Sequence, residues 1–277
     1  MLSQVLVTNN QGDLLVLNLD QVNENVFIEN IEGLDPVKAT LVSSTFSTLD
    51  GAQFQNSRRE PRNIKLTLGL EPDWAVERVK DIRDHLYRFL MPKMKIDLMF
   101  LDDTTETGVD TNDISGIVES FEATLFSAEP SVTISIICYD PDFVAHDDIV
   151  VPGNTVSDSS TFSIDYKGTV ESGMVFALNV NRTVNELTIK CTSPDGTIRT
   201  MDFAFPFVSG DVLEVSTVPG DKRVSLIRAG VKTPILYSLA RLSKWIDLWP
   251  GLNYFNVYAT GAAIPFTISY YERFGGL

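Results

Sequence analysis

The stretch Pro72–Leu90, PDWAVERVKDIRDHLYRFL, has the pattern of an amphipathic helix in a chain whose other segments resemble short strands. Pro72 suits a first helical position, Asp73 favours the N-terminal end of the helix dipole, and Pro92 ends the run. Because a lone amphipathic helix needs a sheet to cover, we expect this helix to organise the first half of the chain. Its apolar residues recur at spacings of three and four, which places them on one face: Val76, Val79, Ile82, Leu86, Phe89 and Leu90.

Alternation of apolar and polar residues surrounds the helix and is typical of half-buried strands. It is clearest in Ile64–Leu70, directly before the helix. Between the early strands and this one lies the polar stretch Ser43–Pro61, which carries the turn signal Asp50-Gly51. The same patterns predict further strands at 4–7, 14–17, 26–31, 37–42, 94–101, 117–125 and 132–138.

The second half has short strand patterns with a turn signal at each break, which favours a β-sandwich. From Tyr139 to Ser160 the composition shifts to Pro, Gly, Asn, Asp and Ser, as in an interdomain crossing. We place the boundary near Val150, giving an N-terminal domain at 1–149 and a C-terminal domain at 150–277. A short helix is an open alternative for one segment, because four of its residues also fit a helical period: Leu239, Leu242, Trp245 and Trp249.

The charge of the chain limits its partners. A formal net charge of −15 over 277 residues argues against a nucleic-acid binder and against adsorption to an anionic membrane. The N-terminus lacks the pattern of a secretory signal, and no apolar run is long enough to span a bilayer. We therefore expect a protein made in the cytoplasm. Cys138 and Cys191 are expected to be small buried side chains rather than a disulfide.

Few residues suggest catalysis or cofactor binding. His85 on the helix and His146 in the crossing are too few for histidine-based metal or hydrolytic sites. No glycine-rich phosphate loop is present, so we expect no cofactor and no enzyme. One acidic segment could supply oxygen ligands to Ca²⁺, but a solvated hairpin loop is favoured: Asp102, Asp103, Glu106, Asp110 and Asp113. Ordinary loop chemistry is favoured for a second group: Asp140, Asp142, Asp147 and Asp148.

Two groups of residues are candidates for binding a partner. Arg58, Arg59 and Arg62 form the densest basic spot of an acidic chain, either as a subunit interface or as a solvated loop. Trp245 and Trp249 either belong to the sandwich core or form an exposed aromatic rim for a sugar or a protein.

The order of several short motifs carries a resemblance over essentially the full length. Arg62 opens an alternating strand after the polar stretch, and a single helix and a long hairpin follow. The later motifs are Cys138–Phe143 (CYDPDF), Gly210–Val215 (GDVLEV), Val224–Leu226 (VSL), Leu248–Asn253 (LWPGLN) and Tyr270–Gly276 (YYERFGG). In this order and spacing, the chain resembles the distal tail protein (Dit) family of long-tailed, siphovirus-type bacteriophages.

The resemblance implies a mainly β fold with two parts. The first would be a β-sandwich-like, tail-tube-like domain with one helix, and the second a galectin-like β-sandwich. Six copies would close a ring that joins the tail tube to tail-tip and receptor-binding proteins. The implied partners are further copies of the chain, the major tail or tube protein, a tail-associated tip protein and a receptor-binding protein. The implied place is the tail tip of a virion assembled in the host cytoplasm.

Two other functions remain open at this point. A carbohydrate-binding adhesin would use the C-terminal sandwich and its aromatic residues, but a galectin-type sugar site uses a His-Asn-Arg set and no histidine follows His146. A glycan-active hydrolase would need a pair of carboxylates whose separation in space the sequence does not give.

Overall fold

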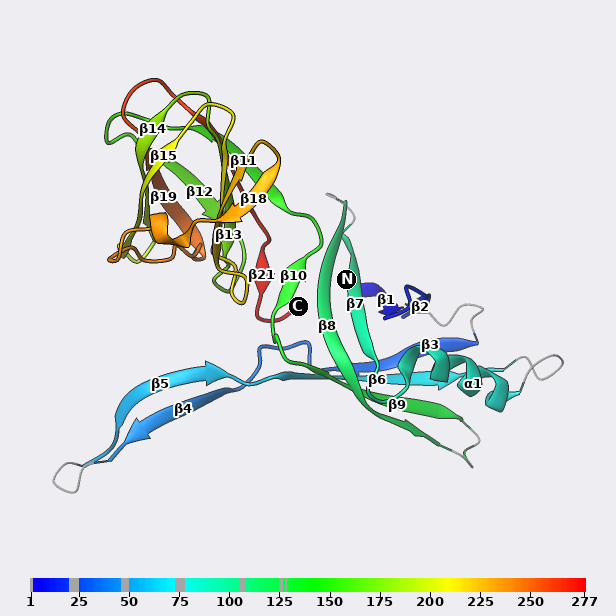
Figure 1. Cartoon of the computed structure of the whole chain (residues 1–277). Coiled ribbons are helices and arrows are strands. Elements are labelled where there is room, and N and C mark those ends of the chain that lie inside the picture. The colour runs from blue at the N-terminus through cyan, green and yellow to red at the C-terminus, as the bar shows by residue number, and fades with distance from the viewer. Residues whose placement is uncertain are drawn as a thin grey trace. The chain divides into compact units, whose positions relative to one another are not determined.

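The computed structural model describes residues 2–19, 25–45, 50–72, 78–104, 108–124, 127 and 129–277. The chain forms two compact units, each with its own core. Unit 1 comprises Met1–His146 together with Gly275–Leu277, and unit 2 comprises Asp147–Phe274. Strands dominate both units (Figure 1), so the predicted mainly β fold is confirmed.

Unit 1 contains one large antiparallel sheet, in the order β2-β1-β7-β8-β9-β6-β3, with the short β10 paired to β8. One face of this sheet is buried and apolar along every central strand, as period-two alternation requires. The strands are β1 (Leu2–Asn9), β2 (Leu14–Asn18), β3 (Val26–Glu32), β6 (Arg62–Leu70), β7 (Lys95–Thr104), β8 (Gly108–Ala123), β9 (Ser131–Cys138) and β10 (Phe143–Ala145).

The helix α1 spans Val79–Leu90 and contacts β1. The expected apolar face is the buried one, with Ile82, Leu86, Phe89 and Leu90 in the core. The helix begins seven residues later than Pro72, because the Asp81 carboxylate accepts the backbone N–H of Arg78 at 3.1 Å and fixes the first turn there. Pro72 is described and lies outside the helix, while Asp73 and Val76 lie outside the described residues.

Two polar segments are strands rather than loops. The acidic segment continues β7 and β8 as a hairpin in which Asp102 lies opposite Asp110, and Glu106 falls outside the described residues. Part of the polar stretch Ser43–Pro61 forms β5 (Gln53–Arg59), which pairs with β4 (Ala39–Ser44) in a separate two-stranded ribbon. Backbone pairing creates these strands where the side chains give no apolar alternation.

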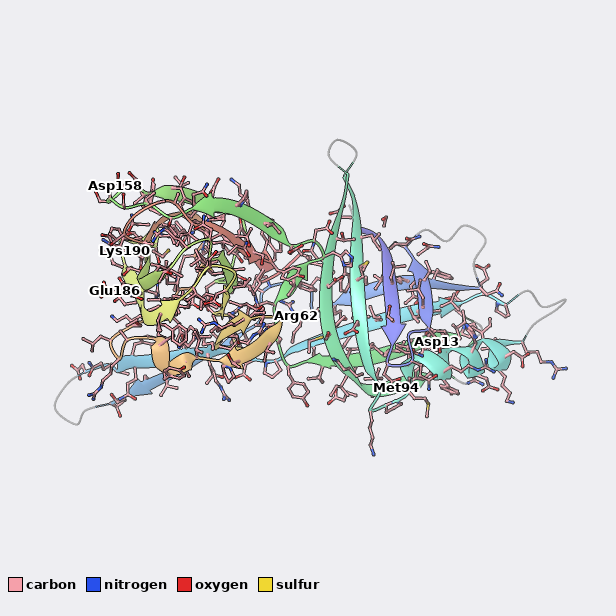
Figure 2. All side chains as sticks on the ribbon, turned by 45° about the horizontal axis from the view of Figure 1, so that its top comes forward. Asp13, Arg62, Met94, Asp158, Glu186 and Lys190 are labelled. Carbon is pink, nitrogen blue, oxygen red and sulfur yellow. The ribbon has the colours of Figure 1, made fainter. Side chains whose placement is uncertain are left out.

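Unit 2 is a sandwich of two antiparallel sheets, with orders β11-β20-β13-β16-β17-β18 and β12-β19-β14-β15. Side chains of both sheets fill one core, and Figure 2 draws the side chains of the chain as sticks. The elements are β11 (Ile149–Asn154), β12 (Phe162–Tyr166), β13 (Met174–Asn179), β14 (Val184–Thr192), β15 (Ile198–Phe207), β16 (Val212–Ser216), β17 (Arg223–Arg228), β18 (Val231–Pro234), η1 (Leu236–Ser238), β19 (Gly251–Tyr258), β20 (Pro265–Tyr270) and β21 (Arg273–Phe274).

Two predictions for unit 2 are corrected. The stretch interpreted as an interdomain crossing contains β11, a full strand that pairs with β20 over six residues. The helical alternative for 239–249 is wrong, because only Leu236–Ser238 makes a short 3₁₀ turn and Leu239 then forms a β-bridge with Phe203. Pairing with a neighbouring strand therefore overrides the local helical period.

Among the residues of unit 1 that the structure describes, Arg62, labelled in Figure 2, is the most deeply buried charge, with 1% of its surface exposed. Its guanidinium donates to four backbone carbonyls, including that of Pro141 at 2.6 Å and that of Asp35 at 2.7 Å. The other two acceptors belong to Gly33 and Gly275. The guanidinium carbon lies 4.4 Å from the ring centre of Phe143. One side chain thus joins β6 to three segments that are far apart in sequence.

Gly33 makes this arrangement possible. It has φ +89°, which disfavours other residues, and a Cβ at this position would lie 2.0 Å from the carbonyl oxygen of Asn63. Close approach of the two backbones brings the Gly33 carbonyl within reach of Arg62. Burial lowers the pKa of the Arg62 guanidinium, yet arginine remains charged because its ordinary pKa is so high.

Unit 2 has an ion pair between a buried carboxylate and an arginine at the surface. Asp211 is 1% exposed and binds Arg228 through two hydrogen bonds, of 2.7 and 2.8 Å. It also accepts the backbone N–H of Val208 at 2.9 Å, which closes the turn before β16. The hydrogen bonds from Arg228 hold the pKa of Asp211 below its ordinary value.

Replacing Arg62 by Met should destabilise unit 1 by about 3 kcal/mol or more, because buried carbonyls lose their donor. Urea unfolding measures this, with hydrogen exchange assigning the affected transition to unit 1. Lys80→Met on α1 is the matched control: its side chain is exposed, so a change within about 0.5 kcal/mol is expected. Equal effects of the two substitutions would contradict the internal role of Arg62.

Replacing Asp211 by Asn should make unit 2 less stable at neutral pH and less sensitive to acid. The folded-state pKa of Asp211 is depressed, so its contribution is present above its unfolded pKa of about 3.9 and disappears as pH falls through the folded value. The difference in unfolding free energy between wild type and variant should therefore shrink below about pH 4. Thermal unfolding across acidic pH checks this, and a constant difference would rule it out.

Candidate functional site

The β4–β5 ribbon is the most exposed structured part of unit 1. Figure 1 shows it extending away from the large sheet, and every residue of β5 is exposed. Leu41 is 68% exposed and Phe54 62% exposed, with Val42 also open to solvent. An isolated two-stranded ribbon is marginally stable in water. Exposed apolar side chains on such a ribbon are therefore typical of a segment that is completed by a partner.

The base of the ribbon is fixed while its remaining length is open. The Arg59 guanidinium pairs with the carboxylate of Asp142, whose side chain is 2% exposed. Across the ribbon, the Thr40 hydroxyl bonds the Glu60 carboxylate, and the Glu60 N–H donates to the Lys38 carbonyl at 2.9 Å. These contacts set the direction in which the ribbon leaves unit 1.

The three arginines of the expected interface have different environments. Arg58 is exposed on the ribbon opposite Thr40. Its neighbour Arg59 points to the other side of the strand and holds Asp142. Arg62 is internal, and its donors are used within its own chain. We therefore keep Arg58 and Arg59 as interface candidates and assign Arg62 to the stability of unit 1.

An acidic groove of about 540 Å³ lies on the outer face of the large sheet and next to the 140–144 segment. Asp113 binds the ring of His146 at 2.7 Å, and Asp97 accepts a hydrogen bond from Ser115. Among the residues that the structure describes, no three His, Cys, Asp or Glu side chains are placed to hold a metal ion. The groove can instead accept basic side chains. Its charged residues are Lys95, Asp97, Asp113, Asp140 and Asp142.

Trp245 and Trp249 both have one ring face near a cation of the same chain. The Lys222 ammonium lies 5.9 Å from the Trp245 ring centre, and the Arg199 guanidinium carbon lies 5.6 Å from that of Trp249. Trp245 packs partly buried against the sandwich core, while Trp249 is 37% exposed. Asp247 lies between them in sequence, and burial raises its pKa. Each tryptophan ring therefore already has a cation–π partner within its own chain.

The remaining candidates of the sequence have structural roles. Cys138 and Cys191 are buried and unpaired, as expected, and burial raises the pKa of each thiol to about 12. His85 is exposed on α1 with its ring 5.3 Å from that of Phe89. In the described part of the chain, no helix is both long and apolar enough to cross a membrane.

Sequence reasoning missed two surface features. The first is the ribbon itself, since the polar sequence of β5 gives no strand signal. The second is an exposed apolar stretch after β18, where Leu236, Tyr237 and Leu242 are open to solvent. A signal for the second was available, because residues 222–246 contain no Asp or Glu in an otherwise acidic chain.

Comparison with known proteins agrees with this architecture. Residues 167–274 match the family model described as siphovirus-type tail component, C-terminal domain. The crystal structure of Dit (gp 19.1) from phage SPP1 is similar over 98% of this chain and 99% of its own, with a TM-score of 0.69 and 15% identity. A chain of the phage P2 baseplate in its activated conformation with Ca matches over 97% of this chain and 98% of its own, with a TM-score of 0.46 and 12% identity. No curated protein sequence matches the chain.

The resemblance to the distal tail protein family is thus confirmed by two findings that concern different lengths of the chain. One covers residues 167–274, most of unit 2, and the other covers nearly all of the fold. Residues 167–274 therefore match the C-terminal domain of siphovirus-type tail components, and the chain as a whole has the fold of SPP1 Dit.

Proposed function

We propose that this chain is a structural hub of a phage tail tip, in which six copies form a ring. The match of residues 167–274 to a siphovirus-type tail component carries the proposal. SPP1 Dit, which has the same fold, is described as a paradigm of the hub adsorption apparatus in phages that infect Gram-positive bacteria. The role is architectural rather than enzymatic.

The ring would join the tail tube to the proteins of the tip. Its partners are then further copies of this chain, the major tail or tube protein, a tail-associated tip protein and a receptor-binding protein. The place of action is the virion, at the distal end of a tail assembled in the host cytoplasm.

The β4–β5 ribbon supports contact between copies. A ring requires head-to-tail contacts, in which one surface of a copy meets a different surface of the next. The ribbon supplies a projecting surface with exposed Leu41, Val42 and Phe54. Burying these side chains on a neighbour would stabilise both the ribbon and the ring.

Charge supports the same contact. Arg58 and Arg59 lie at the end of β5, while the groove on the outer face of the sheet carries Asp97, Asp113 and Asp140 beside Lys95, in addition to Asp142, which pairs with Arg59 of its own copy. Opposite charges on two surfaces of one chain attract successive copies and fix their register. We therefore propose that Arg58 of one copy faces acidic side chains of the next, and that Arg59 mainly sets the direction of the ribbon through Asp142.

Of the alternatives, the carbohydrate-binding adhesin keeps no specific support. Each tryptophan proposed for it has a cation of its own chain near one ring face, which leaves less aromatic surface for a sugar. The hub is therefore the function that we carry forward.

Native mass spectrometry of the purified chain tests the ring. The expected species has the mass of six copies of a 30.7 kDa chain, and negative-stain images should show closed rings. A chain that remains monomeric at high concentration, and that no tail-tube protein can recruit into rings, would refute the proposal.

Ribbon variants test the interface. Leu41→Asp with Phe54→Asp, and separately Arg58→Glu, should abolish the six-copy species without lowering the melting temperature of the monomer, because all three side chains are exposed. Lys80→Glu on α1 is the matched charge control, since its side chain is also exposed. Rings that form normally from the ribbon variants would show that the interface lies elsewhere.

A further inference from the structure

The segment 222–246 differs in charge from the rest of the chain. It contains six lysines and arginines and no Asp or Glu, whereas the whole chain has a net charge of −15, which leaves −21 for the remaining residues. A basic segment on an acidic protein creates a local potential of opposite sign. Such a contrast favours recognition of an acidic partner at one place on the surface.

Half of these cations are neutralised by carboxylates of neighbouring strands. Glu214 binds Arg223 at 2.9 Å and Lys232 at 2.7 Å, and Asp211 binds Arg228 at 2.7 Å. Lys222 lies over the Trp245 ring. The positive charge that is left for an external partner is therefore concentrated at the end of the segment.

That end contains Arg241 and Lys244, which are both exposed. Neither forms an ion pair with any of the residues described by the structure. The hydrogen bond from the Ser243 N–H to the Ala240 carbonyl, 3.0 Å long, closes a turn with Arg241 and Leu242 at its centre. The turn holds a cation and an apolar side chain next to each other at the surface.

The stretch 236–244 follows the edge of β15. Leu239 bridges Phe203, the Ala240 N–H donates to the Asp202 carbonyl at 2.8 Å, and the Lys244 N–H donates to the Thr200 carbonyl at 2.9 Å. These bonds cover an otherwise open strand edge. They also fix the backbone, so that the exposed side chains of the stretch are presented on a defined support.

Three of these side chains are large and apolar. Leu242 is 90% exposed, Tyr237 is 77% exposed and Leu236 is 53% exposed. The Tyr237 ring keeps only a peripheral contact with Phe205, at 6.3 Å between ring centres. Tyrosine and arginine are, with tryptophan, the residues enriched among those that dominate protein interfaces.

We propose that Leu236, Tyr237, Arg241, Leu242 and Lys244, which we name the β15-edge patch, dock a segment of another protein that combines apolar side chains with Asp or Glu. The apolar residues would be buried on contact, and Arg241 and Lys244 would pair with carboxylates at the rim. This interaction goes beyond the ring and does not depend on ring closure.

The combination of cations and exposed apolar side chains favours this occupant over a polyanion. A nucleic acid or an anionic wall polymer would pair with Arg241 and Lys244 but would leave Leu236 and Leu242 without apolar contacts. A short acidic and apolar protein segment satisfies both the cations and the apolar side chains.

Selection from a displayed library of random short peptides tests the proposal on the full chain. Peptides are selected on wild type and counter-selected on the variant Tyr237→Ser, Arg241→Glu, Leu242→Ser. The enriched peptides should combine Asp or Glu with Leu, Phe or Trp. A synthetic peptide of that sequence should bind the variant about tenfold more weakly or worse, by fluorescence anisotropy.

The matched control is Lys190→Glu with Ile198→Ser and Leu252→Ser, which makes the same charge change and removes two exposed apolar side chains outside the patch; Lys190 is labelled in Figure 2. The control should bind the peptide as wild type does. Should the triple variant unfold, Leu242→Glu alone replaces it, because that side chain has almost no contacts to lose.

Other results would overturn the proposal. These are peptides without acidic residues, equal binding to wild type and patch variant, and equal loss of binding in the control. Two further probes separate the other occupants. Patch-dependent binding of dextran sulfate in place of the peptides would indicate a polyanion, and patch-dependent self-association in sedimentation velocity would indicate a second copy.

Discussion

The interior of unit 1 depends on one buried charged side chain whose hydrogen bonds go to backbone carbonyls. Arg62 satisfies four backbone carbonyls, from the turn after β3, from the segment before β10 and from the last residues of the chain. Because a buried guanidinium is costly unless its donors are used, this set of acceptors has to form together. These hydrogen bonds hold the start of β6 in one position. The ribbon leaves the sheet directly before this point, since β5 ends at Arg59 and β6 begins at Arg62. Accurate placement of this projecting segment is what the proposed ring contact would require.

The sequence predicted what local periodicity controls. The buried face of α1 follows from the spacing of Ile82, Leu86 and Phe89, and the alternating residues of β6 predicted a half-buried strand. The predicted start of the helix was wrong, because the helix begins at Val79, where the Asp81 carboxylate accepts the backbone N–H of Arg78 and fixes the first turn. Strand β5 escaped prediction because its seven residues are all exposed and carry no apolar alternation. Nothing local distinguishes such a strand from a loop.

The role of each candidate site residue depends on partners that are distant in sequence. Arg58 and Arg59 are adjacent, yet only Arg59 reaches Asp142, which lies 83 residues away. In the sequence, Arg62 looks like a surface cation, because the Gly275 carbonyl that it binds lies 213 residues further along the chain. The acid-free run 222–246 was visible in the sequence, but which of its cations are neutralised depends on β16 and β17 pairing side by side. Tertiary contacts decide these roles, and composition does not.

The two cysteines have a consequence for how the opening of this protein can be observed. Unit 1 contains Cys138 and unit 2 contains Cys191, and neither forms a disulfide. Both thiols are buried, and burial raises their pKa and so favours the neutral thiol over the thiolate. A thiolate is the reactive species, so neither sulfur can meet an alkylating reagent until its own unit opens. The chain therefore has one latent reporter in each unit. The rate at which each is labelled records the local unfolding of that unit separately, in the free subunit and in any assembly, without adding a probe.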